Sequence, residues 1–223
     1  MTRFITPSTR LSFFAEKFGV QFWRGKTFAH LAVATLFIAA PAFAAQLEFD
    51  EYVQRAQAAV SRGDWESAAS QYAQAINHPD LPRDTATRST VNLEYGRAIG
   101  VLCHYGEAEK YLLRAREMVD KANASAFAAL IELGAISVAQ KKYAEAVGYF
   151  SPLLPLIERE SRTKSSPRVV ADAYEKFALA LAATGKTADA ESYKRAAAQI
   201  RATVPQAVAP GAITPYGTQC PPS

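Results

Sequence analysis

The chain has 223 residues, of which 49% are hydrophobic and 21% are charged, a balance that predicts a folded protein and excludes a disordered one. Its formal net charge of +4 comes from the N-terminal end, because the first 44 residues hold five basic residues and one acidic residue. The other 20 basic and 20 acidic residues cancel, so the body lacks the surplus cations with which a nucleic-acid binder neutralises phosphates.

Residues 1–44 have the order of features found in a secretory signal peptide. Arg24 and Lys26 precede an apolar stretch that begins at Thr27, and the small-x-small cleavage pattern Ala42-Phe43-Ala44 follows it. We therefore expect an exported protein, cut after Ala44 and located in the periplasm or its equivalent.

Three alternatives stay open for this leader. An uncut leader would hold the protein at a membrane, although the stretch from Thr27 to Ala45 contains His30 and Pro41 and falls short of the roughly 20 apolar residues of a membrane span. The Ser-, Thr- and Arg-rich residues 1–19 also resemble a mitochondrial transit peptide. A true start at Val20 would leave a compact basic region of ordinary length.

Residues 45–203 repeat one helical pattern four times. In each unit a small residue in a first helix precedes, by nine positions, the residue that opens a second helix, and an alanine follows the opener by three. Helical spacing places the opener and this alanine on one face, where we expect the alanine to be tightly enclosed between the two helices. The small residues are Ala56, Gly96, Gly134 and Ala178, the openers are Trp65, Tyr105, Tyr143 and Thr187, and the alanines are Ala68, Ala108, Ala146 and Ala190.

A large residue comes four positions after the alanine in three units: Tyr72, Leu112 and Phe150. We expect it to fill the joint to the next unit. Lys194 takes this position in the last unit, which suits a terminal unit that faces water. In the third unit, Pro152 and Pro155 should kink or end the second helix.

With these residues, the sequence resembles the tetratricopeptide-repeat family over about residues 48–201. Its openers lie 38 to 44 residues apart, against about 34 in the family, and the proline that usually closes each repeat is missing. The resemblance implies an all-α fold, a right-handed α-solenoid of about four helix-turn-helix units. Residues 204–223 would form a Pro-rich tail.

The resemblance also implies where a partner protein or peptide segment would bind, because in this family the first helices line a concave groove. The inward positions are mostly apolar, and exposed apolar patches generally mark contact sites. The alternative is that much of this stripe packs between neighbouring helices. Within the groove hypothesis, the tail is expected to fill the groove through Val204, Val208, Ile213 and Tyr216 when no partner is present. The implied groove residues are Val53, Gln57, Val60, Leu93, Arg97, Ile131, Val138 and Leu179.

The two cysteines, Cys103 and Cys220, are candidates for a disulfide because an exported protein meets an oxidising compartment. The alternative is a buried thiol at Cys103 and an unpaired or intermolecular Cys220. Cys103 is followed by His104, but neighbouring side chains on a helix point about 100° apart, which disfavours a thiol nucleophile with its base.

The sequence has no Cys/His set with metal-ligand spacing and no Gly-rich phosphate loop. We therefore expect no enzyme activity, no metal, no cofactor and no small-molecule substrate. The predicted function is a protein-protein interaction scaffold of the cell envelope. A membrane-anchored accessory subunit of an envelope enzyme or secretion complex is the first alternative, and a cell-wall enzyme is the second.

Overall fold

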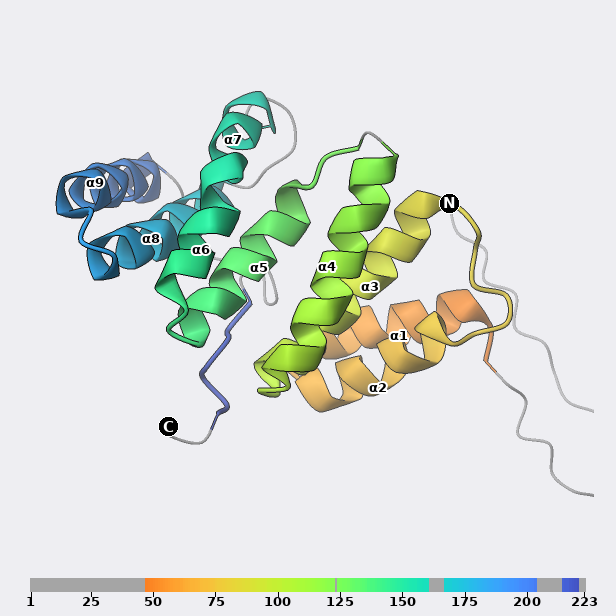
Figure 1. The fold of residues 1–223 in the computed structure, drawn as a ribbon. Coiled ribbons are helices and arrows are strands. Elements are labelled where there is room, and N and C mark those ends of the chain that lie inside the picture. Colours follow the sequence, from red (N-terminus) through yellow and green to blue (C-terminus); the bar gives the residue numbers. More distant parts are fainter. Residues whose placement is uncertain (1–46, 123, 161–166, 204–213, 221–223) are drawn as a thin grey trace, which may run out of the picture. The chain divides into compact units, whose positions relative to one another are not determined.

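The computed structural model describes residues 47–122, 124–160, 167–203 and 214–220. Every regular element within these ranges is helical, so the predicted all-α fold is confirmed (Figure 1). None of the helices in these ranges has the length and apolar character needed to cross a membrane. The predicted signal peptide, its cleavage point and the alternative start at Val20 lie outside the described residues.

The helices form hairpin pairs that stack along the chain. α1 (Phe49–Ser61) packs on α2 (Trp65–Ile76), α3 (Thr85–Val101) on α4 (Tyr105–Lys121), α5 (Phe127–Ala139) on α6 (Tyr143–Phe150), and α8 (Pro167–Ala183) on α9 (Thr187–Thr203). Consecutive pairs meet where α2 contacts α3, α4 contacts α5 and α6 contacts α8. The result is a solenoid-like array in which each pair buries its apolar face against its neighbours.

All four predicted openers are the first residues of helices: Trp65, Tyr105, Tyr143 and Thr187. The predicted effect of Pro152 is also confirmed, because α6 ends at Phe150 and gives way to a 3₁₀ turn (η1, Ser151–Leu153) and a separate short helix (α7, Leu154–Glu160).

The turn between the two helices of a pair has the same backbone conformation in all four units. The residue two positions before each opener has a positive φ: +73° at Gly63, +70° at Cys103, +60° at Lys141 and +83° at Gly185. In every turn its N–H donates to the carbonyl three residues back, and the next N–H donates to the carbonyl five back. This is the Schellman arrangement that ends helices, usually at glycine. Cys103 adopts it at a conformational cost of about 1–2 kcal/mol that glycine avoids.

The joint between the two helices of a pair is as tight as the repeat pattern predicts. Ala108 and Ala146 are 0% exposed. A Cβ atom added to Gly134 would lie 2.6 Å from the ring of Phe150, so the small residue makes room for the large one within its own unit. Phe150 also reaches Phe177 of α8, with ring centroids 5.7 Å apart. The large residue therefore serves its own pair as well as the expected joint to the next.

The last described helix presents a polar face where the other units have a large apolar residue. Lys194 is exposed and forms an ion pair of 2.8 Å with Glu191 one turn earlier. α5, by contrast, is buried along most of its length and contributes to the apolar clusters on both sides of it. Its near-continuous apolar sequence is a consequence of that central place.

Candidate protein-binding face and the C-terminal segment

The C-terminal segment Thr214–Cys220 lies against the first helices α3 and α5, and in Figure 1 it is the blue trace that begins beside α5. Thr214 is only 6% exposed. Its hydroxyl accepts a hydrogen bond from Nε of Arg97 on α3 at 2.9 Å and donates one to Oε1 of Glu132 on α5 at 3.0 Å. One tail residue thus bridges two neighbouring units.

The cluster beneath Thr214 holds two carboxylates and one guanidinium. Nη1 of Arg97 lies 2.7 Å from Oε2 of Glu94, one turn earlier on α3, and its Nε lies 3.1 Å from Oε1 of Glu132. Burial alone would lower the pKa of Arg97, but the charges of Glu132 and Glu94 outweigh it and raise that pKa. Burial raises the pKa of Glu94 despite the nearby guanidinium. When all three groups are ionised, the two carboxylates and the guanidinium give the cluster a net negative charge.

The ring of Tyr216 takes the place that a side chain at Gly100 would occupy. A Cβ atom on Gly100 would lie 2.6 Å from Cε1 of Tyr216 and 3.2 Å from Cδ1 of Ile136 on α5. Burial, followed by the charge of Glu132, raises the pKa of Tyr216 well above its usual value, so its hydroxyl stays protonated. We call the surface formed by Glu94, Arg97, Gly100, Glu132 and Ile136 the tail site.

A tight turn carries the tail away from this site. The N–H of Thr218 donates to the carbonyl of Pro215 at 3.3 Å, and Gly217 has a φ of +83° in the third position of the turn. A positive φ there is the type II arrangement, which requires glycine or asparagine. The turn brings Cys220 back to α4.

A disulfide closes the arrangement. Cys220 is bonded to Cys103; their Cα atoms are 5.6 Å apart, and their sequence separation is 117. The hydroxyl of Tyr105 lies 2.9 Å from Sγ of Cys220, and it is the donor because a disulfide sulfur carries no hydrogen. The thiol-and-base chemistry considered for Cys103 and His104 has no free thiol in this state, and His104 is exposed at the start of α4.

The residues implied for the groove are spread over several environments. Arg97 donates a hydrogen bond to Thr214 of the tail. Leu93, Val53 and Val60 are half-buried against the apolar cluster of the first two pairs. Ile131 is 8% exposed within the second cluster, where Val138 is half-buried. The two that are open to solvent are Gln57 and Leu179, the latter 49% exposed. Val204, Val208 and Ile213 lie outside the described residues.

The sequence reasoning missed Glu94, Glu132 and Gly100. Glu94 and Glu132 stand eleven positions before the openers Tyr105 and Tyr143, so they are equivalent residues of adjacent units and had to lie side by side on neighbouring first helices. Gly100 stands five positions before its opener, where the first and third units have Val60 and Val138. Glycine at a repeat position that is apolar in other units was the available sequence signal that another side chain, here the ring of Tyr216, packs at Gly100.

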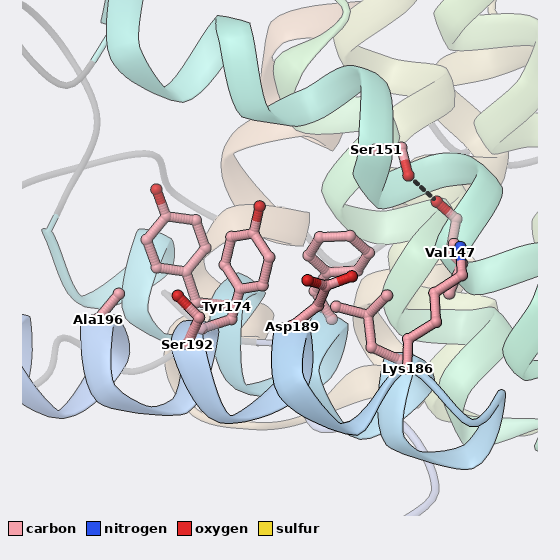
Figure 2. A pocket seen from close by; sticks show the side chains of 10 residues that line it. Val147, Ser151, Tyr174, Lys186, Asp189, Ser192 and Ala196 are labelled. Carbon is pink, nitrogen blue, oxygen red and sulfur yellow. Dashed lines mark hydrogen bonds between the residues drawn. The ribbon is translucent and has the colours of Figure 1, made fainter.

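A separate hollow of about 420 Å³ lies between α6, α8 and α9 (Figure 2). Two aromatic residues line it, Tyr174 and Tyr193, whose ring centroids are 5.4 Å apart. Asp189 of α9 and Lys186 of the turn before α9 also line it. Ser151 donates its hydroxyl to the carbonyl of Val147 at 2.7 Å, as the dashed line shows. Within the described ranges, no group of three or more His, Cys, Asp or Glu residues is placed to hold a metal ion.

Comparisons with known proteins support the fold alone. No family model matches this sequence, and no curated protein matches it either. A crystal structure of BtubC (BKLC) from P. vanneervenii is similar in fold, with a TM-score of 0.62 and 18% sequence identity. The match covers 71% of this chain and 66% of that one, so this chain spans just under two thirds of its length.

Proposed function

We propose that this protein is an exported tetratricopeptide-type scaffold that binds a segment of a partner protein on the face formed by its first helices. One observation carries the proposal: this face already holds a peptide, the chain's own residues Thr214–Cys220. Stacked helix pairs form extended surfaces that repeat proteins use for binding.

The disulfide supports the exported location. A bond between Cys103 and Cys220 persists in an oxidising compartment, whereas thiol buffers keep cytosolic cysteines reduced. Identification of the N-terminal residue of the protein isolated from cells, together with fractionation, tests the location. A chain that starts near Ala45 and fractionates with the periplasm fits the proposal. A chain that retains Thr27–Ala45 and fractionates with membranes favours the anchored accessory subunit.

The binding face is tested by photo-crosslinking, with a matched pair of exposed leucines. A photoreactive residue replaces Leu179 on the first helix α8 or Leu113 on the second helix α4, which are 49% and 39% exposed. We expect adducts with partner proteins in the envelope from position 179, and from Gln57 in the same way, but not from position 113. Adducts from position 113 alone would place binding on the second helices, and adducts from none of the three would contradict a scaffold role.

Substitution of Ile131, one of the implied groove residues, by Asp is unsuitable as a test of binding. Ile131 is part of the core, and a buried, unpaired carboxylate there would unfold the array rather than block binding. Leu179 and Gln57 avoid this difficulty because their side chains face solvent.

A further inference from the structure

The contacts of the C-terminal segment are those of a bound ligand with a defined sequence preference. Thr214 both donates and accepts at the tail site, Tyr216 inserts its ring over Gly100, and Gly217 supplies the positive φ of the turn. The residues that make these contacts all belong to the segment Thr214–Gly217. A segment with the same side chains would make the same contacts if it came from another protein.

We propose that residues Thr214–Cys220 are a disulfide-locked internal ligand, and that reduction of the Cys103–Cys220 bond opens the tail site to a partner segment of the form Ser/Thr-Pro-Tyr/Phe-Gly. This inference rests on the proposed scaffold function and adds the kind of partner and the control of access to it.

The chemistry at each position explains the preference. The first residue has to donate to Glu132 and accept from Arg97 at one point, and the hydroxyl of Ser or Thr does both from a single oxygen. The proline stands at the first position of the turn, where its ring fixes its own φ at about −65°. The aromatic ring fills the space that the absent side chain of Gly100 leaves beside Ile136. The net negative charge of Glu94, Arg97 and Glu132 disfavours an acidic residue at these positions.

Release of the tail is a thiol-disulfide exchange with a dithiol reductant. A thiolate of the reductant attacks Sγ of Cys103, the bond between the two sulfurs breaks, and Cys220 leaves as a thiolate stabilised by the hydroxyl of Tyr105. The second thiol of the reductant then resolves the mixed disulfide. Two electrons and two protons pass to the cysteines, and the reductant becomes a disulfide.

Without the bond, the tail remains attached to the chain and competes with a partner as an intramolecular ligand. The disulfide is therefore needed to exclude partner segments fully. Once it is reduced, the tail and a partner segment compete for the tail site. Oxidised chains should not bind a partner segment at the tail site, whereas reduced chains should bind it at sufficient concentration.

The experiment uses the full chain and a labelled synthetic peptide of residues 211–223 with Ser in place of Cys220. Binding is followed by fluorescence anisotropy up to millimolar peptide. The oxidised wild type should not bind. The variant Thr214→Ala/Tyr216→Ala/Cys220→Ser, whose own tail has lost its contacts, should bind saturably, and a peptide with Ala in place of Tyr216 should bind at least tenfold more weakly.

A glycine pair supplies the matched control. Gly100→Ala, added to the triple variant, should abolish peptide binding because its Cβ occupies the place of the Tyr216 ring. Gly148→Ala on α6 should leave binding unchanged, since a Cβ there meets nothing within 4 Å. Circular dichroism and the thermal midpoint establish that each variant is folded.

Equal binding by the oxidised wild type and the folded triple variant, or no saturable binding by the latter, would overturn the internal-ligand proposal. Equal binding by the Gly100→Ala and Gly148→Ala variants would do the same for the assigned place of the ring. These results would leave the scaffold function standing if Leu179 still gave adducts in the envelope. Loss of those adducts would instead contradict the scaffold function itself.

Discussion

The hydroxyl of Tyr105 donates a hydrogen bond to Sγ of Cys220 at 2.9 Å, within the disulfide that joins the tail to the second helix pair. Tyr105 is also the first residue of α4. Burial raises the pKa of this phenol, so it stays protonated and remains a donor at neutral pH. The residue that opens a helix in the repeat pattern therefore also stabilises the sulfur that leaves when the bond is reduced.

The first prediction concerns the rate of that reduction. Tyr105→Phe keeps the ring in its place but removes the donor, so the Cys220 thiolate becomes a poorer leaving group. We expect reduction by dithiothreitol to slow several-fold, measured by quenching with an alkylating agent and mass spectrometry. Tyr111→Phe, a half-buried tyrosine on the same helix, serves as the control and should reduce at the wild-type rate. Equal rates for wild type and Tyr105→Phe would exclude a role for this hydrogen bond.

The second prediction concerns the left-handed backbone at Cys103. In a Cys220→Ser background, Cys103→Gly should be more stable than Cys103→Ser by about 1 kcal/mol, because glycine adopts a φ of +70° without the cost that a Cβ imposes. Urea unfolding of the two proteins measures the difference. Lys141→Gly tests the same reasoning at an equivalent turn, with a φ of +60°, and should also gain stability. A more stable serine variant would show that the turn relaxes.

The third prediction concerns the joint between paired helices. Ala108→Leu should lower the free energy of unfolding by about 1–3 kcal/mol, because the alanine is fully enclosed and the added atoms have no space. Ala58→Leu is the control: this alanine is exposed on α1, and the same substitution there should change little. Thermal or urea unfolding compares them. An unchanged stability in Ala108→Leu would contradict the close approach of α3 and α4.

The fourth prediction concerns pH and Glu94. Arg97, Glu132 and Tyr72 face this carboxyl, and burial dominates, so its pKa in the folded protein lies above the unfolded value of about 4.5. The folded state then binds the proton more readily, and the ionised carboxyl costs stability as pH rises through the folded pKa. The unfolding free energy of the wild type minus that of Glu94→Gln should therefore fall as pH rises above about 4.5.

Glu117→Gln provides a control of opposite sign. Hydrogen bonding and the charge of Lys121 lower the pKa of Glu117 on the exposed side of α4. Its contribution to stability is present above the unfolded pKa and is lost as pH falls, so the same difference should rise with pH. Urea unfolding across a pH series measures both variants. Parallel trends for Glu94 and Glu117 would show that burial does not dominate at Glu94.

The sequence was sufficient for the helix pairs because their signals are local and repeated. Tyr143 opens a helix for the same reason that Tyr105 does, and the helix spacing of Ala146 follows from it. The tail site was only partly accessible, because it joins residues separated by more than 80 positions, such as Glu132 and Thr214. Distances of that kind depend on how the units stack, which no single repeat specifies.

The residues of the implied groove also show that the sequence of a single repeat does not decide what covers a side chain. Ala135 and Leu179 both stand eight positions before their openers on first helices, yet Ala135 is 4% exposed and Leu179 is 49% exposed. The difference comes from neighbouring helices: α5 lies between the second and last pairs, whereas α8 belongs to the last described pair. Position within a repeat predicts the direction of a side chain, but position within the array decides what covers it.

The covalent ring closed by Cys103 and Cys220 also decides how the protein responds to mechanical load. Helical arrays yield unit by unit when their ends are pulled, because each unit contacts only its neighbours. Here the cysteines lie 117 positions apart, and the chain between them contributes no extension while the bond is intact. A pull on the two termini stretches α1, α2 and α3, and bypasses α4 through α9. Oxidised protein should therefore behave as a short tether of limited reach, and reduced protein as a long one.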